Sequence, residues 1–187
     1  MRIKKTKKGF TLAEVLITLT IMGLIAALTV PTLKKNAERK EFAAKISKTY
    51  SALAQATKIL SQEAAIRYWN SSFIDDNSQD CYAKRLSYLT KEVSGTSVKF
   101  YMNDGQTIEA KDFGTKLTNA TFGADADDKL YGYFIVDVNG ATKPNEYGYD
   151  RYALVLVDGK GLLPSGYSGC TDSYGCASKV IQIGKSN

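Results

Sequence analysis

Glu14 has the most unusual setting of any reactive residue in this sequence, because it is an ionisable side chain inside an apolar stretch. It is the only charged residue between Phe10 and Val30. A helix of these 21 residues would be about 30 Å long, which is the hydrocarbon thickness of a membrane. Since an acid inside a membrane span is costly and usually functional, we predict that Glu14 acquires a partner group.

The sequence lacks the residue types and spacings that several common kinds of catalytic site require. Histidine is absent, and the three cysteines, Cys81, Cys170 and Cys176, form no C-x-x-C pair. Histidine-based triads, imidazole metal sites and histidine acid–base catalysis are therefore excluded. No other catalytic constellation is visible, and we predict that the protein is not an enzyme.

The net charge of +6 comes almost entirely from the leader that precedes Gly9. Subtracting its five positive charges from +6 leaves +1, so the sequence predicts no nucleic-acid partner. A basic cluster beside a span holds its own end in the cytoplasm, although further basic residues follow the span and are partly offset by acids. We therefore predict a single span with a cytoplasmic N-terminus. The leader charges are Arg2, Lys4, Lys5, Lys7 and Lys8.

The pattern after Pro31 predicts that the helix continues with one apolar face. Apolar residues recur at spacings of three, four and seven, which is typical of an amphipathic helix packed on a core. Pro31 is expected to kink one helix that runs from about residue 10 to about residue 66. The apolar stripe consists of Phe42, Ile46, Tyr50, Leu53, Leu60 and Ala64.

The remaining residues, 67–187, are predicted to form a β-rich head. Runs of β-branched and aromatic residues indicate strands, and Asn103-Asp104-Gly105 between two of them is typical of a tight hairpin. Because no crossover helices separate the runs, the sheet should be antiparallel. The predicted class is α+β, a long N-terminal helix packed on an antiparallel head. The expected strands are 97–102, 106–110, 131–138, 152–157 and 180–183.

All three cysteines lie beyond the span, on the side where a disulfide is expected if that side is extracytoplasmic. Cys170 and Cys176 can close a small loop, which would leave Cys81 unpaired. A bridge from Cys81 to the C-terminal region is the competing choice, and the sequence leaves both open. We favour the local pair.

The junction between the leader and the apolar stretch resembles the type IV prepilin processing motif. It reads Lys8-Gly9-Phe10-Thr11-Leu12-Ala13-Glu14, with glycine before phenylalanine and glutamate five residues into the mature chain. The span and Pro31 that follow also match this family of type IV pilins and type II secretion pseudopilins. The resemblance implies cleavage by prepilin peptidase after Gly9 and N-methylation of Phe10. It also implies that Glu14 and Phe10 direct assembly.

On this resemblance the chain has four segments. Residues 1–9 are a cleaved leader, 10–30 a transmembrane and assembly helix, 31–66 its amphipathic continuation, and 67–187 the globular head. The expected partners are copies of the same chain in a helical filament, the peptidase and methylase, an assembly platform and the bacterial inner membrane. The subunit would end in an extracytoplasmic or cell-surface filament. The rival hypothesis is a signal-anchored extracytoplasmic binding domain that never polymerises.

One pattern in the head suggests a metal ion, although no cofactor is required by the motif. Asp137, Asn139 and Asp150 lie in a segment similar to one seen in pilin-like and pseudopilin-like heads. Because major pseudopilins hold a structural calcium in this region, the resemblance makes these three residues candidate calcium ligands. The simpler interpretation, which we favour, is that the Asx and Gly residues make turns between strands.

Overall fold

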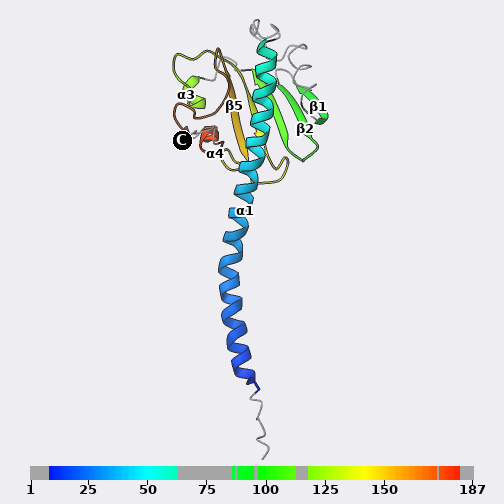
Figure 1. The fold of residues 1–187 in the computed structure, drawn as a ribbon, viewed down its shortest axis with the longest axis vertical. Helices are drawn as coiled ribbons and strands as arrows, with labels where there is room; N and C mark the ends of the chain where they lie inside the picture. The colour runs from blue at the N-terminus through cyan, green and yellow to red at the C-terminus, as the bar shows by residue number, and fades with distance from the viewer. Residues whose placement is uncertain are drawn as a thin grey trace, which may run out of the picture. The chain divides into compact units, whose positions relative to one another are not determined.

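The computed structural model of the chain describes residues 9–62, 86, 88–94, 97–112, 118–171 and 173–181. The chain divides into two compact units, Met1–Lys40 and Glu41–Asn187. Figure 1 shows helix α1, Leu12–Gln62, which contributes residues to both units. Pro31 lies inside this helix. The predicted long helix is therefore confirmed over residues 12–62, whereas the predicted extension to residue 66 lies outside the described residues.

The first unit contains the apolar part of α1. The helix there is long and apolar enough to cross a membrane. Every residue from Gly9 to Ala37 is exposed, so this part of the chain buries none of its apolar side chains against itself. An uninterrupted apolar surface of this length must be covered by lipid or by other protein.

The second unit is built on one six-stranded antiparallel sheet whose strand order, β1 to β6, follows the chain. The β2–β3 connection contains the predicted hairpin, with Gly105 at a φ of 83° and the Gln106 carbonyl bonded to the Met102 amide at 2.9 Å. The strands are β1 Tyr88–Ser94, β2 Ser97–Met102, β3 Thr107–Asp112, β4 Leu130–Asp137, β5 Arg151–Val157 and β6 Gly161–Pro164.

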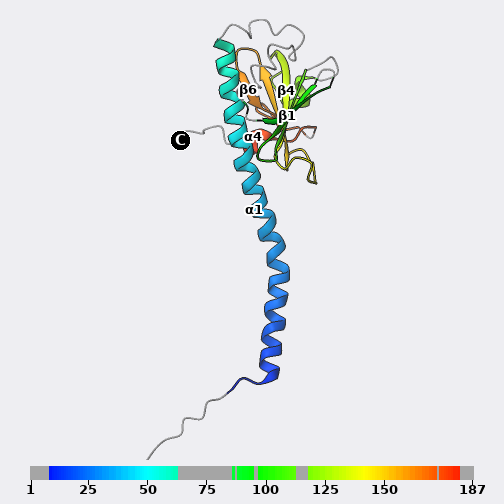
Figure 2. The same ribbon diagram turned by 90° about the vertical axis from the view of Figure 1, so that its right-hand side faces the viewer.

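Side chains of the head that alternate along the central strands fill two separate cores. On one face, Phe134 and Leu154 pack in a cluster with the second half of α1, which lies against the sheet (Figure 2). Phe42, Ile46 and Leu53 of the predicted stripe are buried there, as an amphipathic helix requires. The predicted packing of helix on sheet is confirmed.

The opposite face of the sheet is covered by loops and by the short helix α3, Asn119–Phe122. Phe122 is fully buried and stacks on Tyr174 with ring centroids 4.6 Å apart. Tyr133 and Tyr147 contact the same Tyr174 ring. Tyr133, Tyr147 and Tyr174 therefore contribute to the core on this face of the sheet.

The sequence prediction was wrong at the C-terminus of the sheet and missed both edge strands. Residues Ala177–Val180 form helix α4, where a strand was expected from Val180, and Gln182 and Ile183 lie outside the described residues. A helical turn places Ala177 and Ile181 on the same side, and both are buried in the core below α1. Strands β1 and β6 were not predicted.

We predict that Leu53→Ala destabilises the head by about 2–5 kcal/mol, because it leaves a cavity between α1 and the sheet. Leu53 is fully buried, whereas Ile59 on the same helix is 40% exposed. Ile59→Ala is therefore the matched control and should cost less than about 1 kcal/mol. Chemical denaturation of both variants, followed by circular dichroism, measures the difference. Equal losses would show that α1 does not pack on the sheet as described.

Candidate functional site

Glu14 lies in the first turn of α1 and is bonded to the residue that precedes the helix. Its Oε2 accepts hydrogen bonds from the backbone N–H of Thr11 at 2.8 Å and from the Thr11 hydroxyl at 2.9 Å. The Thr11 hydroxyl in turn accepts the Glu14 N–H at 3.3 Å. This reciprocal arrangement is a capping box, in which Thr11 is the N-cap and Glu14 the third helical residue. The acid therefore has a local partner within its own chain.

Sequence reasoning missed the role of Thr11, although a signal for it was present. A threonine three residues before a glutamate, at the start of an apolar run, is the typical pattern of a capping box. The box lowers the cost of placing the carboxylate in an apolar stretch, because it satisfies part of its hydrogen-bonding capacity. It does not neutralise the charge. Both bonds end on Oε2, so Oε1 keeps its capacity to accept a hydrogen bond from another donor.

The predicted processing residues lie immediately before the helix. Gly9 and Phe10 are outside α1 and exposed, and Phe10 is 89% exposed. A Cβ atom added to Gly9 would meet no other atom within 4 Å. The peptide bond between them is therefore accessible to a peptidase, and glycine allows its backbone to approach closely.

Cleavage after Gly9 would create an ammonium group on Phe10, one helical turn from Glu14. A positive charge at a helix N-terminus is disfavoured by the helix dipole, so this ammonium needs an anionic partner. The other polar side chains of the apolar stretch offer none. The hydroxyls of Thr18, Thr20 and Thr29 each donate to a backbone carbonyl of the preceding turn. Glu14 is the only anion of this stretch.

Cys170 and Cys176 form a disulfide, with Cα atoms 5.3 Å apart, which confirms the favoured pairing. The loop that it closes carries Tyr174, the ring that covers Phe122. Cys81 lies outside the described residues. The disulfide therefore holds in place the loop that covers Phe122 on this face of the sheet.

The three candidate metal ligands lie at or near the connection between β4 and β5. Asp137 ends β4 and pairs in register with Arg151, whose Nε donates to Asp137 Oδ2 at 3.0 Å. Burial raises the pKa of Asp137, and the Arg151 guanidinium opposes that effect. Both carboxylate oxygens of Asp150 accept backbone N–H groups, from Asn145 at 2.7 Å and Glu146 at 2.6 Å.

This connection lacks the cluster of acids found in many metal sites. Within the described residues, no group of three or more Asp, Glu or Cys side chains converges on one point. Two buried oxygens nevertheless have no hydrogen-bond partner, Asp137 Oδ1 and Asn139 Oδ1. Oxygen atoms of this kind suit a hard cation such as calcium.

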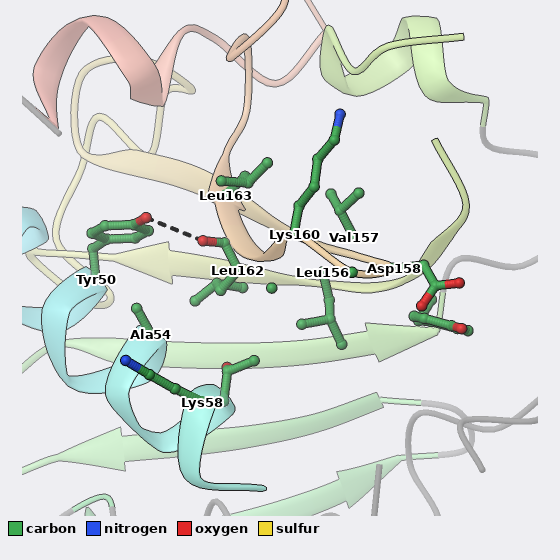
Figure 3. A pocket seen from close by; sticks show the side chains of 13 residues that line it. Tyr50, Ala54, Lys58, Leu156, Val157, Asp158, Lys160, Leu162 and Leu163 are labelled. Carbon is green, nitrogen blue, oxygen red and sulfur yellow. Dashed lines mark hydrogen bonds between the residues drawn. The ribbon is translucent and has the colours of Figure 1, made fainter. Parts of the chain in front are cut away.

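A pocket of about 830 Å³ lies between α1 and the β5–β6 hairpin of the head (Figure 3). Its walls combine aliphatic and aromatic side chains with the polar side chains of Thr57, Lys58, Asp158 and Lys160. The Tyr50 hydroxyl donates to the Leu162 carbonyl at 3.1 Å, and the Thr57 hydroxyl donates to the Leu53 carbonyl. The ammonium of Lys160 is held by Asp125 and Asp128. The Tyr50 and Thr57 hydroxyls and the Lys160 ammonium therefore already make bonds within the head.

Residues 4–30 match the family model described as the prokaryotic N-terminal methylation motif. This stretch is the prepilin-type signature of type IV pilins and pseudopilins, and it contains Gly9, Phe10 and Glu14. The recognition made from the sequence is therefore confirmed. No curated protein and no solved structure matches the chain significantly.

We predict that Thr11→Val frays the start of α1, because valine cannot accept the Glu14 N–H or donate to its carboxylate. Loss of an N-cap costs about 1 kcal/mol, so backbone amides of the first turn should exchange roughly fivefold faster. Hydrogen exchange of the full chain in detergent micelles measures this rate. Thr20→Val is the control, because the Thr20 hydroxyl bonds a carbonyl inside the helix and caps nothing. Unchanged first-turn exchange in Thr11→Val would disprove the capping box.

Proposed function

We propose that the protein is a structural subunit of a type IV pilin-like filament, either a pilus or a type II secretion pseudopilus. The prepilin-type signature supports a precursor that prepilin peptidase cuts after Gly9 and a methylase modifies at Phe10. The observation that carries the proposal is the fully exposed apolar segment of α1 that follows this signature. Such a segment suits the inner membrane before assembly and a helical bundle after it.

Cleavage prepares the subunit to leave the membrane. The leader holds five positive charges, and moving them through the bilayer would be costly. Once they are removed, the charges left in the apolar segment are the Phe10 ammonium and the Glu14 carboxylate. A charge at the centre of a membrane costs about 2.5–3.5 kcal/mol on insertion scales, and less near the interface. A partner for each charge therefore favours transfer into a bundle.

In the filament, Glu14 Oε1 would accept a hydrogen bond from the Phe10 ammonium of a neighbouring subunit, while Oε2 remains bonded to Thr11. The pair sets register, because a subunit added one turn out of place would leave both charges buried and unpaired. The contact joins two different surfaces of identical chains, so it does not close and produces an open fibre. Burial of the apolar side chains of residues 10–30 would supply most of the free energy of assembly. The Glu14 ion pair would fix the register of each added subunit.

The remaining assignments follow from this role. The protein acts on no substrate of its own, and its partners are further copies of the chain, the processing enzymes, the assembly platform and the inner membrane. The N-terminus begins in the cytoplasm and the head lies on the extracytoplasmic side, where the Cys170–Cys176 disulfide is stable. A signal-anchored binding domain would share the span but would have no need of processing.

The processing step predicts the mass of the N-terminal peptide. In native cells the mature chain should begin at Phe10 and carry one added methyl group, and Gly9→Leu should retain the leader. Mass spectrometry of the N-terminal peptide measures both. A wild-type chain that still carries its leader would contradict the proposal and favour the anchored binding domain.

The Glu14→Gln variant distinguishes a role of Glu14 in an ion pair from a role in the helix cap. Glutamine can still complete the capping box with Thr11, but it carries no charge for the Phe10 ammonium. We predict that Glu14→Gln lowers the yield of sheared filaments at least roughly tenfold, because the variant strands a buried ammonium. Immunoblotting of filament and membrane fractions measures this yield.

The control for this variant is Glu41→Gln, which removes an exposed charge that pairs with Lys45. An exposed pair of this kind contributes little, so its filament yield should be normal. Normal yield in Glu14→Gln as well would mean that Glu14 serves only as a cap.

A further inference from the structure

A short basic segment of α1 follows the exposed apolar stretch and ends the first unit of the chain. Residues 34–40 contain four basic residues and one acid, and subtracting the acid leaves a net charge of +3. All of these residues are exposed except Glu38, which is partly buried. We call this segment the basic collar. Its basic residues are Lys34, Lys35, Arg39 and Lys40.

The position of the basic collar along α1 matches the thickness of a lipid bilayer. Glu14 and Lys34 lie in the same helix, and the rise between them is about 30 Å, which is the thickness of the hydrocarbon layer. When Glu14 lies near one interface, Lys34 therefore reaches the headgroups of the other. From Lys34 to Lys40 the helix rises by about a further 9 Å, which is comparable with one headgroup layer.

The charges of the basic collar surround the helix instead of forming a stripe on one side. Successive residues of a helix are turned by about 100°, so Lys34, Lys35 and Lys40 point in three different directions. Arg39 lies between the directions of Lys35 and Lys40. A protein groove would contact one side of such a segment, whereas a bilayer contacts every side of a helix that crosses it. The distribution therefore favours a lipid surface as the partner.

The acid within the basic collar leaves most of its positive charge uncompensated. Glu38 Oε1 lies 3.9 Å from the Lys34 ammonium, and the Lys34 side chain is 77% exposed. An exposed ion pair at this distance is weak. The ammonium of Lys34 is therefore still able to approach an external anion, and one acid cannot neutralise four bases.

We propose that the basic collar binds the anionic phosphate headgroups of phospholipids in the leaflet opposite the leader, and so holds the unassembled subunit at a fixed depth. A Lys or Arg beside a span favours anionic lipid by roughly fivefold for each residue near the surface. The inference rests on the membrane stage of the proposed function and does not require a filament.

The proposed cleavage gives the basic collar a further consequence. The precursor has basic residues at both ends of its span, five in the leader and four in the collar. Removal of the leader after Gly9 would leave the collar as the only basic cluster beside the span. The processed subunit would then be held by headgroups at one end only, which is the end nearest the head. Release of these headgroups becomes part of the transfer from membrane to filament.

A photoreactive amino acid in place of Asn36, which is exposed inside the basic collar, tests which lipid lies beside it. The full chain is reconstituted in vesicles of equal parts phosphatidylglycerol and phosphatidylcholine, and mass spectrometry identifies the crosslinked lipid. We expect at least about threefold more crosslinks to phosphatidylglycerol than to phosphatidylcholine. Salt at about 1 M should reduce this excess, because it screens exposed charges. Since both leaflets have the same composition, the orientation of the chain does not affect the result.

Three results would overturn the proposal in different ways. Equal crosslinking to both lipids would exclude the preference of the collar for anions, while the membrane stage of the proposed function would stand. Crosslinks to other copies of the chain in place of lipid would show that the collar is a protein contact. A chain that does not float with the vesicles would contradict the membrane stage itself.

Replacing Lys34, Lys35 and Lys40 together by glutamine tests whether the collar charges cause the preference. We expect the excess of phosphatidylglycerol crosslinks to disappear, and to persist when the same three lysines are replaced by arginine. The matched control replaces three exposed lysines outside the collar by glutamine and should keep the excess. An excess that survives loss of the collar lysines, or disappears in the control, would overturn the proposal. The control lysines are Lys48, Lys143 and Lys179.

Discussion

The carboxylate of Glu14 sets the main physical constraint on this protein, since it is the only charge in an apolar stretch that spans residues 10–30. The structure shows how the chain partly solves this problem by itself. Thr11 binds one carboxylate oxygen through its backbone and its hydroxyl, so the acid is hydrogen-bonded but still charged. The remaining need is for a cation, and the proposed cleavage before Phe10 would create one on every copy of the chain.

The two units of the chain differ in how they bury their apolar side chains. The first unit leaves its apolar residues exposed, so their burial requires lipid or other protein. The second unit buries its own, with α1 on one face of the sheet and a disulfide-closed loop near the other. In the proposed filament subunit, a head that buries its own core would remain constant while the exposed helix moves from the membrane to the filament core.

Sequence patterns predicted the parts of this molecule that depend on local chemistry. The limits of β2 and the turn at Gly105 followed from β-branched residues and an Asp-Gly step. Strand β6 was missed because Gly161 and Pro164 bound a run of only four residues, which becomes a strand through pairing with β5. The α4 segment was misread because a short apolar run has no period that separates a helix from a strand.

The central claim is a contact between the Phe10 ammonium of one subunit and the Glu14 carboxylate of another. Filaments assembled from a mixture of subunits, half labelled with ¹⁵N at Phe10 and half with ¹³C at the Glu14 carboxylate, isolate the contact between chains. Solid-state NMR then measures the nitrogen–carbon distance directly. The account predicts a distance of about 4 Å or less, as in an ion pair. An intermolecular distance beyond about 6 Å, in well-ordered filaments, would contradict it.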